Sequence, residues 1–174
     1  DDRVSLGNPA AFQLQDFTID AWVKRSSSSV VTNNPASFNA GNIVSYGPDG
    51  YAVVIEGSTG HIGLSKVGTS AVFGTQPILD TNYHHIAITK SGTQVRIYVD
   101  GVGQGPFTFN ETFAFTSNLA IGAPGGASLE NAFFGAVDEV EIFNRALSAG
   151  EIADLATASG AGKCQTPIVQ FERP

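Results

Sequence analysis

The sequence predicts an all-β fold, a sandwich of two antiparallel sheets followed by one short C-terminal helix. Many short segments alternate apolar and polar side chains, and glycine-, proline- and asparagine-containing turns separate them at regular spacing. Charged residues make up 14% of the chain, well below the roughly 25% of an average globular protein. A helix start signal appears in one stretch near the C-terminus.

The clearest strand is Phe17–Lys24, in which every second residue is apolar. The long, serine-rich stretch Ser26–Asn42 has no usable period and predicts a surface loop. Asp100-Gly101 begins a further hairpin, and Phe107–Phe115 is an aromatic-rich segment. The strands expected before the C-terminal region are Val4–Leu6, Phe17–Lys24, Ile43–Tyr46, Tyr51–Glu56, His61–Val67, Tyr83–Thr89, Gln94–Val99 and Leu119–Gly122.

The last strand lies within Phe133–Leu155 and carries a carboxylate among apolar positions. Alternation places Asp138 on the same face as Ala136, Val140 and Ile142. A buried carboxylate must have a partner, because an unpaired buried charge is very costly.

The helix that follows this strand has a clear start. Ser148 is a good N-cap, and Glu151 three residues later completes a capping box. Ile152 and Leu155 give the helix an apolar side that is expected to pack on the body of the domain.

Charge and composition exclude several classes of function. The net charge of −7 argues against nucleic acid and against an anionic membrane surface, and no apolar run is long enough to cross a bilayer. Cys164 is the single cysteine, so an internal disulfide or a cysteine metal cluster is ruled out.

Four motifs in order carry a family resemblance: FTIDAWVK, NYHHIAITKSGTQVRIYVDG, LAIG and FFGAVDEVEIFNRALSAGEI. Together they resemble the concanavalin A-like, laminin G-like superfamily, most closely the bacterial LamG-like jelly-roll domains and more distantly the pentraxins. The resemblance implies a jelly-roll domain over residues 1–158, with 159–174 as a tail or linker. Tyr83 departs from the tryptophan usual at that position of the family, but keeps an aromatic ring. The fold hosts lectins, adhesion modules and glycosidases alike, so it does not by itself fix the function.

Asp138 is the first candidate for a metal site. The resemblance implies a structural calcium ion beside this strand, held by the Asp138 carboxylate, backbone carbonyls and Asn8 or Asp2. The alternative is that Asp138 accepts hydrogen bonds from backbone N–H groups and holds the N-terminal strand.

A second candidate site uses aromatic and polar side chains that could bind a sugar. Asp49 aligns near a calcium-binding acid of pentraxins, but the loop that should supply the other ligands has no carboxylate before Glu130, and a Pro-Asp-Gly sequence favours a turn. The alternative for the aromatic residues is that they pack inside the fold. The predicted ligand-binding residues are Tyr46, Asp49, Tyr51, Arg96 and Tyr98, with Trp22, Asn33 and Asn34 as further candidates.

Catalysis is not expected. The Glu-Asp-Glu strand pattern of the superfamily's retaining glycosidases is absent, although Glu139 and Glu141 share a strand face at about the 7 Å that suits an inverting pair. His84 and His85 face opposite sides of a strand and cannot easily bind one ion, and His84 is expected to be a hydrogen-bonded core residue.

We therefore expect a non-catalytic recognition module of a larger secreted bacterial protein, at the cell surface or outside the cell. Its expected partner is a glycan or an extracellular protein, with a possible structural calcium ion. A structural spacer or protein-interaction domain without a small ligand is the alternative, and a glycoside hydrolase is the least favoured.

Overall fold

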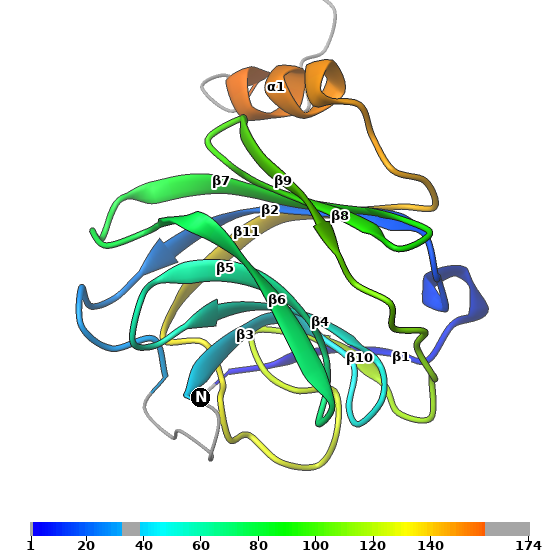
Figure 1. Cartoon of the computed structure of the whole chain (residues 1–174). Helices are drawn as coiled ribbons and strands as arrows, with labels where there is room; N and C mark the ends of the chain where they lie inside the picture. The colour runs from blue at the N-terminus through cyan, green and yellow to red at the C-terminus, as the bar shows by residue number, and fades with distance from the viewer. Residues whose placement is uncertain (1, 33–38, 159–174) are drawn as a thin grey trace, which may run out of the picture.

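A computed structural model describes residues 2–32 and 39–158, which form two antiparallel sheets packed face to face (Figure 1). The prediction of an all-β jelly-roll sandwich is confirmed. The six-stranded sheet has the order β1 (Val4–Gly7), β10 (Leu119–Ile121), β3 (Ala40–Ser45), β4 (Tyr51–Glu56), β5 (His61–Lys66) and β6 (Ser70–Pro77). The five-stranded sheet has the order β11 (Gly135–Phe143), β2 (Phe17–Arg25), β7 (Tyr83–Ser91), β8 (Gln94–Val99) and β9 (Val102–Thr108). A short 3-10 helix, η1 (Ala10–Phe12), leads into β2.

The main core lies between the two sheets and contains an aromatic cluster. Tyr51 is at its centre, with ring centroids 4.8 Å from Phe17, 5.0 Å from Tyr46 and 5.6 Å from Phe113. Tyr46 and Tyr51 are fully buried, and the Tyr51 hydroxyl donates a hydrogen bond to the backbone carbonyl of Phe12. Burial raises the pKa of both phenols, because the charged phenolate would lie in an apolar interior.

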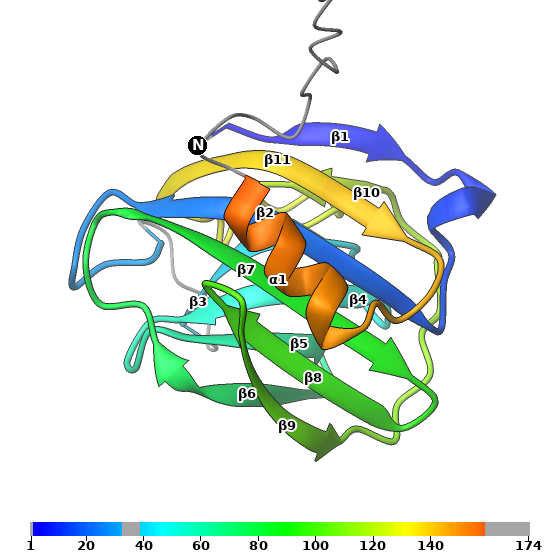
Figure 2. The same ribbon diagram turned by 90° about the horizontal axis from the view of Figure 1, so that it is seen from above.

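Helix α1 (Ala149–Ala158) lies on the outer face of the five-stranded sheet (Figures 1 and 2). Leu147 and Ile152 are buried there against Ala87 and Tyr98. The predicted capping box is confirmed. The Glu151 amide donates to Ser148 Oγ at 3.3 Å, and the Ser148 amide donates to Glu151 Oε2 at 2.8 Å.

Strand β11 does not keep the strict alternation that the sequence suggests. Its register to β2 shifts between Asp138, opposite Trp22, and Glu141, opposite Asp20, so β11 has one extra residue there. This β-bulge turns Asp138 outward, and its side chain is exposed. The expectation that Asp138 shares a core-facing side with Val140 and Ile142 is therefore wrong.

Three predictions fall on residues that the structure does not describe. Asn33, Asn34 and the expected tail at 159–174 lie outside the described residues. Within the described part of the chain, no helix is long and apolar enough to cross a membrane.

Candidate functional site

A shallow pocket of about 270 Å³ opens on the outer face of the five-stranded sheet. We call it the Trp22 pocket, and it is lined by Trp22, Tyr83, Asp138 and Glu139. Three neighbouring strands contribute to it. Asp138 on β11 is opposite Trp22 on β2, and Trp22 is opposite His85 on β7. Because Tyr83 is two residues before His85, it points to the same face.

The bulge in β11 supplies the fourth lining residue. Glu139 occupies the left-handed backbone region, with φ of 48°, and its amide donates a 2.8 Å hydrogen bond to Asp138 Oδ1. Left-handed backbone is uncommon for a residue other than glycine, asparagine or aspartate. Bulges commonly redirect side chains near functional sites, and this one places two consecutive carboxylates beside one indole.

Trp22 rests on a buried polar pair. Its ring centroid is 5.5 Å from that of His85, whose side chain is fully buried. His85 Nε2 donates a 3.2 Å hydrogen bond to Oδ2 of Asp20, which is also fully buried. A buried hydrogen-bonded pair of this kind fixes the orientation of both side chains, so it holds the surface on which the indole packs.

Tyr83 is the most exposed ring of the pocket, with 48% of its surface accessible. Lys24 is opposite it on β2, and the Lys24 ammonium lies 5.6 Å from the centroid of the Tyr83 ring. Such a cation–π contact is modest at an exposed site but favours one ring orientation.

These groups together can bind a polar molecule that has one apolar face. Tyrosine and tryptophan rings offer a flat surface with a negative face that attracts weakly positive C–H groups. Carboxylates are pure acceptors, and each can accept hydrogen bonds from two hydroxyl groups. A sugar ring combines these two features, with C–H groups on one side and hydroxyls along its edge.

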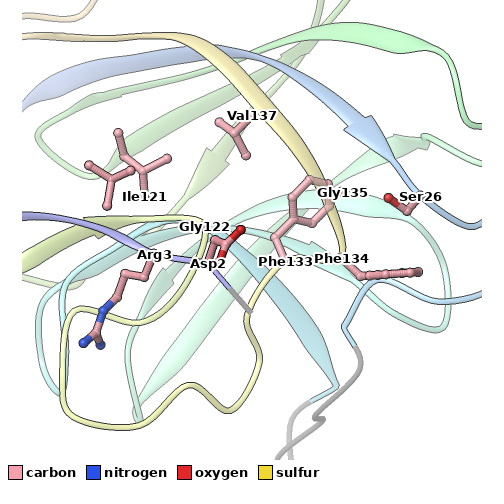
Figure 3. Close-up of a pocket in the computed structure, with 10 residues that line it drawn as sticks. Asp2, Arg3, Ser26, Ile121, Gly122, Phe133, Phe134, Gly135 and Val137 are labelled. Carbon is pink, nitrogen blue, oxygen red and sulfur yellow. The ribbon is translucent and has the colours of Figure 1, made fainter.

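A second, larger hollow of about 430 Å³ lies where the sandwich is open, between the edge strands β1 and β11 (Figure 3). We call it the edge pocket. Ile121 and Val137, from opposite sheets, contribute apolar side chains, and Asp2 and Ser26 contribute polar ones. The lining residues are Asp2, Arg3, Val4, Ser26, Ile121, Gly122, Phe133, Phe134, Gly135 and Val137.

The edge pocket is less suited to sugar recognition despite its size. The guanidinium of Arg3 already donates from Nη1 to the carbonyls of Pro124 and Gly126, and Figure 3 shows it pointing away from the phenylalanine rings. Phe133 belongs to the hydrophobic core and is 9% exposed, so its ring offers little surface to a ligand. The Trp22 pocket therefore carries the stronger candidate chemistry.

The five predicted ligand-binding residues do not form one site. Tyr46 and Tyr51 are buried between the sheets, and Tyr98 is buried beneath α1, so none of these rings can stack on a sugar. Expecting them to be exposed was wrong, because side chains of the opposite sheet and of the helix cover them. Asp49 is an exposed turn residue with φ of 64°, as its Pro-Asp-Gly sequence favoured. Arg96 is exposed on β8, where its Nη1 donates to the carbonyl of Gly105.

The two proposed calcium ligands belong to different parts of the sandwich. Asp138 faces outward from the five-stranded sheet, whereas Asn8 follows β1 of the six-stranded sheet. The Asn8 amide is also engaged, since Nδ2 donates to the carbonyl of Phe115 and Oδ1 accepts from Gln13. Within residues 2–32 and 39–158, no cluster of three histidine, cysteine or acidic side chains is placed to hold a metal ion. The predicted pair thus does not fit a shared calcium ion, and a calcium site stays a prediction.

His84 and His85 point to opposite faces of β7, as alternation predicts. The fully buried histidine is His85, so the expectation that His84 is the core residue is wrong. His84 donates from Nδ1 to Asp100 at 2.7 Å and from Nε2 to Asp80 at 3.1 Å, and 18% of its side chain is exposed. Burial alone would lower the pKa of His84, but the hydrogen bonds to Asp100 and Asp80 outweigh it and raise the pKa above its ordinary value.

Tyr83 and Glu139 were not predicted as site residues. Alternation along each strand already predicts that Tyr83 shares a face with His85, and that Lys24 shares a face with Trp22. Pairing of β2 with β7 would have brought these positions together on one face. Glu139 had no such signal, because the bulge that turns it into the pocket depends on the register of β11 against β2.

The family model of the concanavalin A-like lectin/glucanases superfamily, in its laminin G-like form, matches residues 1–153. The chain belongs to this family. No curated protein sequence matches it. The family match confirms the resemblance seen in the four sequence motifs.

Several solved structures share the fold at low sequence identity. A heptameric SAP-like pentraxin from Limulus polyphemus is 17% identical, with a TM-score of 0.66 over 85% of this chain and 72% of its own. The CBM40 of the Ruminococcus gnavus IT-sialidase is 14% identical, with a TM-score of 0.65, and the match covers 84% of this chain and 86% of the CBM40 chain. A third similar structure is domain 4 of AbnA, a GH43 extracellular arabinanase from Geobacillus stearothermophilus, in complex with arabinotriose. It is 21% identical, with a TM-score of 0.61, and the match covers 82% of this chain and 66% of that chain. At these identities the likeness establishes the fold.

Proposed function

We propose that this domain is a non-catalytic, extracellular recognition module that binds a glycan in the Trp22 pocket. The observation that carries the proposal is the exposed Tyr83 ring beside Trp22, with the carboxylates of Asp138 and Glu139 at the same pocket. Aromatic surface and a few convergent polar groups are the usual composition of a small-ligand site.

Two of the similar structures support a sugar ligand. Two of the structural neighbours are a carbohydrate-binding module of a sialidase and an arabinanase domain that holds arabinotriose. The arabinanase is described as extracellular, which supports the same location for this domain.

The arrangement of acids favours binding without hydrolysis. Glycosidases need two carboxyl groups that flank the scissile bond from opposite sides. Asp138 and Glu139 are consecutive residues of β11, and the other lining residues of the pocket are Trp22 and Tyr83. The pocket therefore has acceptors on one wall and no opposing acid among its lining residues.

Trp22 is the sole tryptophan of the chain, so its fluorescence reports on this pocket specifically. We expect a glycan that binds here to shift or quench the emission in a saturable way. Tyr83→Ala should weaken binding about tenfold, because it removes the exposed stacking surface. A glycan array followed by fluorescence titration of its hits, with calcium and with a chelator, tests this.

Two variants serve as controls. Tyr83→Phe keeps the ring and should retain most of the affinity, and Val102→Ala removes exposed apolar surface from the distant edge strand β9. If no glycan changes the emission, the carbohydrate proposal fails and the spacer or protein-interaction alternative is favoured. Release of reducing sugar from a bound glycan would instead indicate a hydrolase.

A further inference from the structure

The Trp22 pocket carries negative charge in an arrangement that bears on which sugars it can accept. Two of its four lining side chains are carboxylates, and no lysine or arginine is among those four. Asp138 is exposed, and its Oδ1 accepts the Glu139 amide, so the carboxylate is oriented by the backbone of the bulge. A ligand in the pocket therefore meets an oriented acceptor rather than a donor.

The charged residues next to the pocket have both signs. Lys24 is the adjacent cation, and its ammonium lies over the Tyr83 ring. Glu141 is on the same strand beyond the bulge. Two carboxylates line the pocket and one ammonium group lies next to it, so the charged groups at the pocket are net negative.

We propose that the Trp22 pocket selects uncharged and amino sugars and rejects anionic ones such as sialic and uronic acids. This inference rests on the proposed glycan-binding function and specifies the class of ligand. Hydroxyl groups donate to the Asp138 and Glu139 carboxylates, and an ammonium group does so with added attraction. A sugar carboxylate cannot donate, and it loses its hydration while facing two like charges.

The size of the preference follows from Coulomb's law near a protein surface. Like charges a few ångströms apart at a partly hydrated site repel enough to weaken binding by about tenfold. The repulsion must shrink with added salt, because the screening length falls from about 10 Å at 0.1 M to about 3 Å at 1 M. A preference based on shape alone would not depend on salt in this way.

The experiment compares sugars with and without a charged group, by titration of Trp22 fluorescence. The probes are lactose against sialyllactose, galactotriose against trigalacturonic acid, and the chitosan trimer against cellotriose. We expect lactose and galactotriose each to bind at least about tenfold more tightly than the anionic sugar of the same pair. The chitosan trimer should bind more tightly than cellotriose. The difference should narrow at about 1 M salt.

A double variant, Asp138→Asn with Glu139→Gln, tests the assigned origin of the preference. It keeps the side-chain shapes and should remove most of the discrimination against anionic sugars. The matched control, Glu130→Gln with Asp154→Asn, removes the same charge from exposed positions outside the pocket and should leave the preference unchanged.

The outcomes separate this inference from the function beneath it. If anionic sugars bind as tightly as neutral ones, or if the double variant keeps full discrimination, the inference is overturned while glycan binding stands. If no sugar of any charge alters the emission of Trp22, the proposed function itself fails, and the inference fails with it.

Discussion

The hydrogen bond between Asp20 and His85 decides how well Trp22 is held at the pocket. Both side chains are fully buried, so removing one partner leaves the other in an environment without water. We expect Asp20→Ala to lower the free energy of unfolding by about 1–3 kcal/mol, the cost of an unsatisfied buried group. Urea unfolding followed by circular dichroism measures this loss. The emission of Trp22 should also shift to the red as its support on His85 loosens.

Asp20→Asn is the matched variant, because it keeps an oxygen acceptor for His85 Nε2. It should destabilise the protein less than Asp20→Ala and leave the emission maximum close to that of the wild type. Equal stability of Asp20→Ala and the wild type would show that the pair does not support the pocket.

Single residues also mark where the sequence was insufficient. Tyr46 and Tyr51 flank a turn, which suggested exposure, yet they pack against Phe17, Phe113 and one another across the two sheets. Their burial depends on residues far away in the chain, and no local pattern encodes it. The pocket shows the same limit, since Trp22 was a named candidate but its neighbours came from strand pairing.

At the scale of elements, the sequence predicted the strands and the helix start that depend on residues close together in the chain. The strands with regular alternation and the α1 capping box were found because period and cap lie within a few residues. Strand β6 was not predicted, and β9 was implied only by the hairpin expected at Asp100-Gly101, without bounds. Both are edge strands that carry glycine and proline. Glycine and proline are tolerated in an edge strand because only one side of the strand forms hydrogen bonds to a neighbour. The amino-acid composition of an edge strand can therefore resemble that of a loop.

The α1 cap yields a prediction about stability. Ser148→Ala removes the acceptor for the Glu151 amide and should lower the free energy of unfolding by about 1 kcal/mol. The effect should reach the whole domain, because Leu147 and Ile152 beside the cap are buried against the five-stranded sheet. Urea unfolding followed by circular dichroism measures it. Thr157→Ala, at an exposed position near the other end of α1, is the control and should have a smaller effect.

The same cap should depend on pH. Hydrogen bonds from Arg145 and then from Ser148 lower the pKa of Glu151 from 4.5 to about 2. Because the pKa is lowered by folding, the stabilisation is present above pH 4.5 and is lost as the pH falls toward about 2. Glu151→Gln should therefore have a lower free energy of unfolding than the wild type at neutral pH. This difference should disappear as the pH falls from 4.5 to about 2. Urea unfolding at a series of pH values checks it, and a gap that stays constant would contradict the assigned cause.

At the scale of the whole molecule, the sandwich differs between its two sides. Strands β6 and β9 contact one another and close one side, whereas β1 and β11 leave the edge pocket open on the other. Exposed edge strands invite pairing with another chain, and acidic side chains and bulges oppose this. Strand β11 has both devices at Asp138 and Glu139, so the bulge that shapes the Trp22 pocket also protects the open edge.

Calcium is the last question that belongs to the whole domain. An ion bound by the folded state alone must raise the melting midpoint, and at a hundredfold excess over its dissociation constant it adds about 2.7 kcal/mol. We expect the midpoint to be the same in calcium and in a chelator. Asp138 is on β11 of the five-stranded sheet, whereas Asn8 follows β1 of the six-stranded sheet and its amide is already engaged. Calorimetry of the wild type and Asp138→Asn in both conditions checks this. A calcium-dependent rise in the wild type that is lost in Asp138→Asn would establish a calcium site at Asp138, with ligands other than Asn8.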